Sequence, residues 1–176
     1  MALEHALLVA ISEQPLAGLD LAKRFDRSIG FFWHATHQQI YRVLARMEAD
    51  GWVDVTTVAQ EGRPDKKVYA VTPVGSEVLR AWLAAPTEPE PLRSELAVKL
   101  RGASFGDRDA VLDVVRANLA DHHLRLEHYR HLQTRDYPVP AGLDGLELDQ
   151  YLVLRGGLLM EEAWIAWLTE YLEAHR

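Results

Sequence analysis

The sequence contains no cysteine, which excludes a disulfide framework and a metal site built from thiolates. It also has no uninterrupted run of about 18 apolar residues, the length that a membrane-spanning helix needs. The apolar N-terminus carries Glu4 and His5, and it lacks the basic start and small-residue cleavage site of a secretion signal. We therefore expect a cytoplasmic protein that neither crosses a membrane nor is secreted.

The residue patterns of common enzymes are missing as well. There is no glycine-rich loop that would cradle a phosphate, and nothing indicates a Ser-His-Asp triad. Histidines are frequent between residues 122 and 131. His128 and His131 have the i, i+3 spacing of a metal pair, and Glu127 lies four residues before His131. Because these residues alternate with arginines, as on a solvated helix face, we expect no metal, no other cofactor and no catalysis.

Acidic residues outnumber basic ones, but they are unevenly distributed. The 176 residues include 19 Lys and Arg against 26 Asp and Glu, a net charge of −7. Residues 1–85 are nearly neutral, with nine basic and ten acidic side chains, whereas residues 86–176 hold ten and sixteen. A negative total disfavours a polyanionic partner, but the first half retains enough positive charge for a local basic surface.

The most informative stretch is residues 36–50, which we predict to be a helix with both ends marked. Thr36 and Gln39 form a capping box, in which each side chain satisfies a free backbone N–H of the other residue. Gly51 stands where a left-handed stop is expected, because glycine has no Cβ to clash there. One apolar stripe follows the i, i+3, i+4, i+7 pattern: Ile40, Val43, Leu44 and Met47.

The opposite side of this helix carries hydrogen-bonding and stacking side chains. We call it the reader face, and it comprises His37, Gln38, Tyr41 and Arg42. No acidic residue occurs between Arg27 and Met47. A helix whose N-terminal half offers such a face is typical of a reader of the DNA major groove, with Thr36 at its start. The alternative is an ordinary solvated helix face.

The surrounding sequence favours the DNA-binding interpretation. Helical patterns cover residues 2–12 and 19–28, and three short helices ending in a polar-faced one are typical of helix-turn-helix modules. Alternating β-branched residues then predict strands at 53–57 and 68–71. The intervening loop carries Arg63, Lys66 and Lys67, as a wing reaching DNA phosphates would. The alternative is a hairpin whose charges only aid solubility.

A fourth helix closes this first region. Thr72 caps it, and Pro73 occupies the first position, where its missing N–H costs nothing. We expect its buried stripe to comprise Val74, Val78, Leu79 and Trp82. Three prolines within residues 85–91 then mark a linker, which divides the chain into domains 1–85 and 92–176.

The second domain is predicted to be helical, with a short helix at 92–100 and long helices at 107–135 and 143–174. The first long helix repeats buried-type residues at three- and four-residue steps: Leu112, Val115, Leu119, His122, Leu126 and Tyr129. Gly156 and Gly157, in the middle of the second, indicate that another backbone packs closely there. Two such helices have more apolar surface than they can bury alone, so we expect a homodimer. The predicted fold is thus mainly α with a small β-hairpin: a winged helix-turn-helix followed by a long-helix dimerisation domain.

The chain resembles the PadR family of bacterial transcriptional regulators over nearly its whole length. The matching residues are Phe32, Trp33, residues 36–41, Leu44, Glu48, residues 51–53, residues 62–64, Lys67, Tyr69, residues 72–75, Leu79, Trp82 and Leu83, with a looser match at Lys99, Leu100, Trp167 and Leu168. The resemblance implies a homodimer that binds a palindromic operator in double-stranded DNA and usually represses a neighbouring gene. It also implies that the reader face, Arg63, Lys66 and Lys67 contact the DNA.

Some relatives in this family release DNA when a small aromatic compound binds. We identify Trp82, Trp164 and Trp167 as candidate ligand-binding residues, since aromatic side chains line such pockets. The alternative is that these tryptophans belong only to the core. For the whole protein, the rival hypothesis is a protein-interaction module that uses the helical second half and binds no specific DNA.

Overall fold

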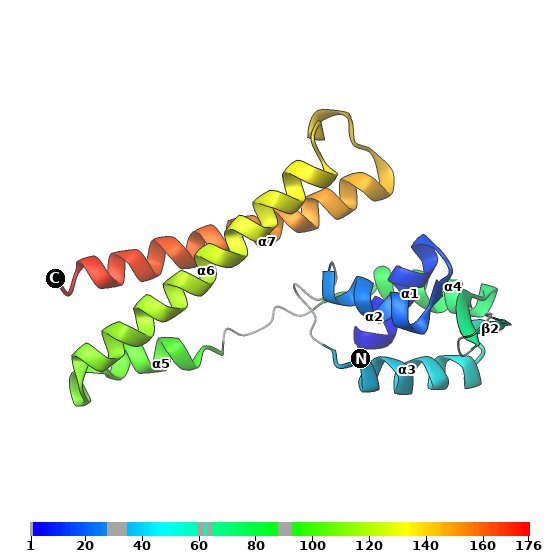
Figure 1. Ribbon diagram of the computed structural model, residues 1–176, viewed down its shortest axis with the longest axis horizontal. Helices are drawn as coiled ribbons and strands as arrows, with labels where there is room; N and C mark the ends of the chain where they lie inside the picture. The colour runs from blue at the N-terminus through cyan, green and yellow to red at the C-terminus, as the bar shows by residue number, and fades with distance from the viewer. Residues whose placement is uncertain (1, 28–34, 60–61, 63–64, 88–92) are drawn as a thin grey trace. The chain divides into compact units, whose positions relative to one another are not determined.

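A computed structural model describes residues 2–27, 35–59, 62, 65–87 and 93–176, with the backbone alone at residues 2 and 25–27. The chain divides into two compact units, residues 1–89 and 90–176, here called the N-terminal and C-terminal units (Figure 1). Arg63 of the predicted wing lies outside the described residues, as do Phe32 and Trp33.

The N-terminal unit combines four helices with a small sheet in the described residues. Helix α1 is followed at once by a short strand and α2, and α3 is the helix predicted to read DNA. Strands β2 and β3 then lead into α4. The bounds are α1 (Ala2–Glu13), β1 (Leu16–Ala17), α2 (Gly18–Arg27), α3 (His37–Ala49), β2 (Val53–Val58), β3 (Lys66–Val71) and α4 (Pro73–Leu83).

The sheet has three antiparallel strands in the order β1-β3-β2. The predicted hairpin is present, but both of its strands extend further toward the turn than the sequence pattern indicated. Strand β1, which the sequence analysis missed, pairs Leu16 with Tyr69 and Ala17 with Val68. A two-residue strand shows no alternation of its own, so only its partner reveals it. Through this pairing the wing is joined directly to the start of α2.

The core of the N-terminal unit draws residues from all four helices and the sheet. Ile40, Leu44 and Met47 of α3 are fully buried, as their spacing predicted. From α1, α2 and the strands come Leu7, Leu8, Ile11, Leu21, Val53 and Tyr69. The predicted stripe of α4 is partly wrong: Leu79 is buried, but Val74 is 55% and Trp82 39% exposed. The face of α4 that packs inward passes instead through Gly75 and Leu79.

A tight junction joins the end of α3 to the start of α4. Thr72 Oγ1 accepts a hydrogen bond from Gly75 N at 3.0 Å and donates to Gly51 O at 2.7 Å. The predicted left-handed stop is present, with φ of 70° at Gly51. A Cβ at Gly75 would lie 2.1 Å from the carbonyl oxygen of Trp52. Glycine at position 75 therefore allows α4 to begin directly against the turn that follows α3.

The described residues of the C-terminal unit form helices joined by short turns, with no strand among them. Two 29-residue helices lie side by side and are joined by a short turn (Figure 1). The bounds are α5 (Glu95–Gly102), η2 (Ala103–Phe105), α6 (Arg108–Asp136), η3 (Pro140–Gly142) and α7 (Gly145–Glu173). The predicted N-cap of α6 is confirmed, since Asp107 accepts from Ala110 N at 3.2 Å.

The predicted seam of α6 is the surface that packs against α7. Leu112, Val115, His122, Leu126 and Tyr129 are buried, and Leu119 is partly buried. Near one end of the pair, Leu100 of α5 joins Val115 and Leu168, with Trp164 and Trp167 packed around them. Within the described residues, no second backbone packs against the glycines of α7. A Cβ at Gly157 would meet the Tyr129 ring at 3.3 Å, and one at Gly156 would meet nothing within 4 Å.

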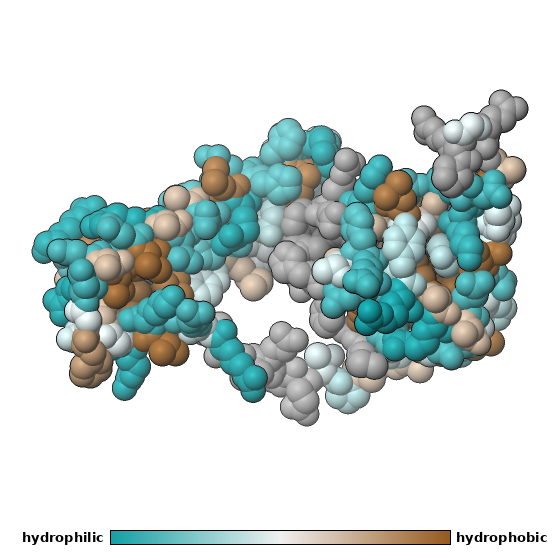
Figure 2. Space-filling model, turned by 60° about the horizontal axis from the view of Figure 1, so that its bottom comes forward, coloured by the Kyte–Doolittle hydropathy of each residue, from teal (hydrophilic) through white to brown (hydrophobic). Residues whose placement is uncertain are grey.

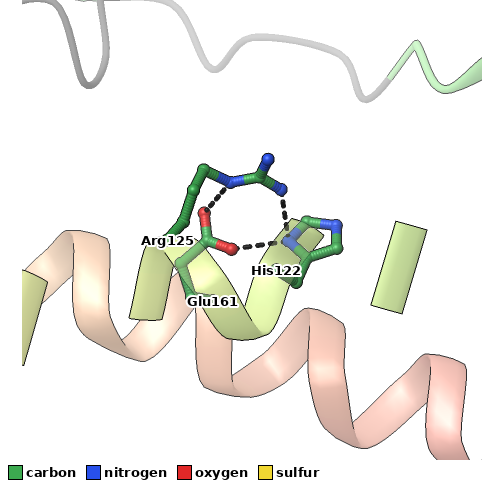
Figure 3. Close-up of polar contacts among 3 residues, drawn as sticks. All are labelled: His122, Arg125 and Glu161. Carbon is green, nitrogen blue, oxygen red and sulfur yellow. Dashed lines mark hydrogen bonds and ion pairs between the residues drawn. The ribbon is translucent and has the colours of Figure 1, made fainter. Parts of the chain in front are cut away.

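A polar group interrupts this seam (Figure 3). His122 Nδ1 lies 2.5 Å from Glu161 Oε2 and 2.7 Å from Arg125 Nη2, and Arg125 Nε donates to Glu161 Oε1 at 3.2 Å. Trp164 stacks on the His122 ring at 5.1 Å. His122 and Glu161 are both more than nine-tenths buried, so they satisfy one another where water cannot. The seam thus includes a buried polar pair that an all-apolar heptad pattern would not contain.

Candidate nucleic-acid interface

The start of α3 is held by the predicted capping box. Thr36 N donates to Gln39 Oε1 at 2.8 Å, and Gln39 N donates to Thr36 Oγ1 at 3.2 Å. The hydroxyl of Thr36 is therefore engaged by the helix itself. This cap fixes the first turn of α3, and with it the direction in which His37 and Gln38 project.

All four residues of the reader face are exposed on one side of α3, opposite the buried stripe. The first turn of the helix contains no acidic residue, so nothing there would repel a phosphate. Arg46, further along, is used differently: it forms an ion pair with Glu4, a buried residue of α1. This contact fastens the second half of α3 to α1.

Tyr41 is exposed by 44%, and one side of its ring rests on the beginning of α2. A Cβ built on Gly18 would lie 2.5 Å from Cε1 of this ring. Any residue with a side chain at position 18 would push the ring away. Gly18 thus determines where the Tyr41 ring lies on the reader face, a role that the sequence analysis did not identify.

The two wing lysines do not lie in the loop, as predicted, but at the first two positions of β3. Successive residues of a strand point to opposite faces, so Lys66 and Lys67 diverge. Lys67 is exposed and forms no ion pair with any residue that the structure describes. The predicted position of Lys66 and Lys67 in the loop between the strands is therefore wrong. Strand pairing across β2, with Lys66 opposite Val58, extends the ladder to include them.

Lys66 forms an ion pair with an acidic residue of a neighbouring helix. Its Nζ lies 2.7 Å from Oδ2 of Asp20 in the first turn of α2. The hydrogen bond from Lys66 lowers the pKa of Asp20, and the positive charges of Lys66 and Lys23 act in the same direction. On the core side of the same strand, burial raises the pKa of Tyr69, with further contributions from Glu48 and Tyr41. The junction of α2, α3 and β3 therefore joins the helix-turn-helix to the wing.

The three candidate ligand-binding tryptophans fall into two separate groups. Trp82 belongs to the N-terminal unit, where it stacks on His5 with ring centroids 4.5 Å apart. Trp164 and Trp167 belong to the C-terminal unit and lie 5.2 Å apart. A shallow groove of about 430 Å³ lies on the N-terminal unit, and none of the three lines it; its lining residues are Ser12, Ser76, Leu79, Arg80, Leu83 and Ala84.

The described ranges contain no group of three or more His, Asp or Glu residues arranged to hold a metal ion. His128 and His131, which have the spacing of a metal pair, are both exposed on α6. In the same part of the chain, no helix has the length and apolarity needed to cross a bilayer.

A capped, polar-faced helix braced by a helix-turn-helix partner and followed by a β-hairpin defines a winged helix-turn-helix protein. Comparison with known families agrees. Residues 7–81 match the model of the transcriptional regulator PadR-like family, and residues 92–176 match the model described as virulence activator alpha C-term. The chain belongs to the PadR family of DNA-binding transcriptional regulators, a family of regulators rather than enzymes.

Relatives match over almost the entire chain. The probable transcriptional regulator Rv1176c of Mycobacterium tuberculosis is 50% identical, across 99% of this chain and 97% of its own. The Vibrio cholerae virulence activator AphA is 32% identical, and its structure covers 98% of this chain and 96% of its own with a TM-score of 0.81.

The Bacillus subtilis regulator PadR has been solved with two different partners. Its complex with operator DNA is 26% identical, covers 99% of both chains and gives a TM-score of 0.88. Its complex with p-coumaric acid is 25% identical, covers 99% of this chain and 98% of the other, and gives a TM-score of 0.80.

Proposed function

We propose that this protein is a sequence-specific repressor that binds its operator through the reader face of α3. The observation that carries the proposal is the composition of that face. Gln38 offers the donor and acceptor pair that matches adenine, and Arg42 offers the fork that matches guanine or a phosphate. Tyr41, whose ring rests against Gly18, can reach an oxygen of the DNA backbone. The B. subtilis PadR complex with operator DNA supports a DNA partner.

The protein acts as a homodimer, in our proposal, through the outer side of α7. That side exposes Leu152, Val153, Leu159 and Met160, each by more than half of its surface, and we call these residues the α7 apolar stripe. Figure 2 shows hydrophobic residues reaching the surface between hydrophilic ones. Gly156 lies within the stripe and leaves room for a second backbone. Fully burying one such side chain contributes about 1.5–3 kcal/mol. Burying the α7 apolar stripe against a second copy is therefore favourable.

A two-fold dimer presents two identical reader faces. Its operator is therefore expected to be a palindrome whose half-sites are about 34 Å apart, one turn of B-DNA. Since a repressor works on the chromosome, we propose a cytoplasmic location. We also propose that a small aromatic compound releases the DNA, by analogy with the B. subtilis PadR complex with p-coumaric acid. Trp164 and Trp167 are the candidate contacts in the C-terminal unit, and Trp82 in the N-terminal unit.

Binding titrations test DNA recognition. Fluorescence anisotropy is measured on the DNA upstream of the protein's own gene and on a scrambled duplex of equal length. Arg42→Ala is compared with Arg80→Ala, which removes the same charge from exposed α4. We expect Arg42→Ala to lose about 1–3 kcal/mol on the specific site and Arg80→Ala to change little. Equal losses for the two variants, or no preference of the unchanged protein for its own promoter, would contradict the proposal.

Effector binding is tested with the intrinsic fluorescence of the tryptophans. A panel of planar aromatic acids, including p-coumaric acid, is titrated into the protein, and then into its complex with promoter DNA. We expect at least one compound to change the emission and to release the DNA at similar concentrations. An emission that responds to no compound of the panel would assign Trp82, Trp164 and Trp167 to the core alone.

A further inference from the structure

We propose that Asp20 is a specificity-determining residue, an acid that neutralises the wing lysine Lys66 and thereby limits affinity for DNA of any sequence. The proposal rests on the proposed DNA-binding function and extends it. It concerns a residue outside both the reader face and the wing.

The pairing of Asp20 with Lys66 follows from the sheet. Ala17 of β1 lies opposite Val68 of β3, two residues beyond Lys66. Helix α2 begins directly after β1, so its first turn rises beside the start of β3, and Asp20 is in that turn. The two charged atoms are 2.7 Å apart. The pair is thus fixed by the backbone of two elements rather than by the free rotation of a loop.

The pair contributes little to folding. The side chains of Lys66 and Asp20 are 39% and 45% exposed, and exposed ion pairs are usually worth less than about 1 kcal/mol because water and salt screen them. What the pair does change is the charge that the wing offers to a polyanion. Of the two described wing lysines, Lys66 is neutralised by Asp20 and Lys67 is not.

Neutralising Lys66 affects binding to non-specific DNA and binding to the operator unequally. On non-specific DNA the protein adjusts its position until any available cation meets a phosphate, so a freed Lys66 gains a full contact. On the operator, base contacts from the reader face fix the register of the unit on the duplex. A freed Lys66 then gains only what that register allows. Removing the charge of Asp20 is therefore expected to raise non-specific affinity more than specific affinity.

The experiment compares Asp20→Asn, Lys66→Ala and the double variant with the unchanged protein, on promoter and scrambled DNA at several salt concentrations. One more phosphate contact steepens the salt dependence by about 0.9 and raises affinity about eightfold at 0.1 M salt. We expect Asp20→Asn to show this on scrambled DNA, with a smaller gain on the promoter. Lys66→Ala should weaken both, because it leaves Asp20 facing the phosphates. The double variant should resemble the unchanged protein.

Asp54→Asn is the matched control, since Asp54 is an exposed acid of β2 in the same unit and the change of charge is identical. Equal gains for Asp20→Asn and Asp54→Asn would overturn the proposal, because net charge alone would explain them. A double variant that still binds scrambled DNA as tightly as Asp20→Asn would overturn the role of Lys66. If the unchanged protein failed to prefer its promoter, the proposed function would fail, while the response of Asp20→Asn on scrambled DNA would still decide the role of Asp20.

Discussion

The two units each expose one helix side of distinct character, and the two sides have opposite chemistry. On α3 the exposed residues of that side are His37, Gln38, Tyr41 and Arg42, all with hydrogen-bonding groups. On α7 they are the apolar stripe of Leu152, Val153, Leu159 and Met160. The first side suits a hydrated, charged partner that displays base edges, and the second suits another apolar surface.

The difference between the cores explains this division. The N-terminal unit buries residues from four helices and a sheet, so its core is complete within one chain. The C-terminal unit consists mainly of two paired helices, whose seam includes the His122–Glu161 pair as well as apolar residues. A helix pair has only one inner surface, so the remaining apolar residues of α7 stay outside. A unit with a complete core can use its surface for DNA, whereas we propose that a second copy covers the remaining apolar residues of the C-terminal unit.

The largest expected effect comes from the tightest contact of the N-terminal unit. Gly75→Ala places a Cβ 2.1 Å from the carbonyl oxygen of Trp52, a backbone atom that cannot turn aside. We expect the free energy of unfolding to fall by about 3 kcal/mol or more. Urea denaturation measures it. Gly102→Ala in the C-terminal unit, where a Cβ meets nothing within 4 Å, should change stability by less than about 1 kcal/mol. Similar losses of unfolding free energy for Gly75→Ala and Gly102→Ala would contradict this difference in packing between the two glycines.

The next effect tests whether the C-terminal unit depends on a second copy. Met160→Glu puts a charge in the α7 apolar stripe and should produce monomers at micromolar concentration, because an unpaired carboxylate would be buried in the interface. Light scattering gives the mass, and the melting temperature of the unchanged protein should rise with concentration. Val74→Glu, at an apolar position of α4 that is 55% exposed against 65% for Met160, should remain dimeric. A dimeric Met160→Glu would place the interface elsewhere.

The division of labour between α3 and the wing predicts two different binding defects. Gln38→Ala should cost about 1–3 kcal/mol on the operator only and relax the preference at one base position. Lys67→Ala should weaken specific and non-specific binding alike and flatten the salt slope by about one unit. Titrations on promoter and scrambled DNA at several salt concentrations separate the two. If the two variants exchanged these behaviours, our assignment of base and phosphate contacts would be reversed.

A smaller effect is expected where Gly18 supports Tyr41. Gly18→Ala should force the Tyr41 ring off its preferred rotamer, at a cost of about 0.5–1.5 kcal/mol in operator affinity. In a Tyr41→Ala background the same substitution should have no further effect on binding, because the ring is already absent. Anisotropy titrations of the unchanged protein, the two single variants and the double variant complete this double-mutant cycle. Additive losses would show that Gly18 acts by some route other than Tyr41.

The smallest effect concerns a feature that the units share. Burial raises the pKa of Tyr69 in the N-terminal unit and of Tyr129 in the C-terminal unit above the ordinary value of 10.0. Above pH 10 the unfolded chain therefore loses these protons before the folded one, so stability should fall as the pH rises further. Urea midpoints at pH 9 and pH 11 measure this. Tyr69→Phe should reduce the fall, and a pH dependence unchanged by that substitution would exclude Tyr69 as a cause.

Much of this fold could be read from local sequence patterns. The capping box of Thr36 and Gln39, the caps at Thr72 and Asp107, and the positive φ of Gly51 all occur where the sequence predicted them. Each of these depends on residues within four positions of one another, and the chemistry of such neighbours is fixed before the chain folds. The buried stripe of α3 is predictable for the same reason, because helical periodicity determines which residues share a face.

The arrangement around the candidate site depended on tertiary structure. Strand β1 forms only because β3 pairs with it, and that pairing brings Asp20 to Lys66 across 46 residues of sequence. No local pattern shows that the Tyr41 ring packs against Gly18. Nor does one show that α4 packs through Gly75 while Trp82 remains partly exposed. Sequence alone thus determined the main helices, the hairpin of β2 and β3, and the kind of surface on α3. Which charges stay available to a partner was decided by contacts between distant segments, since those contacts exist only once the sheet and helices have packed.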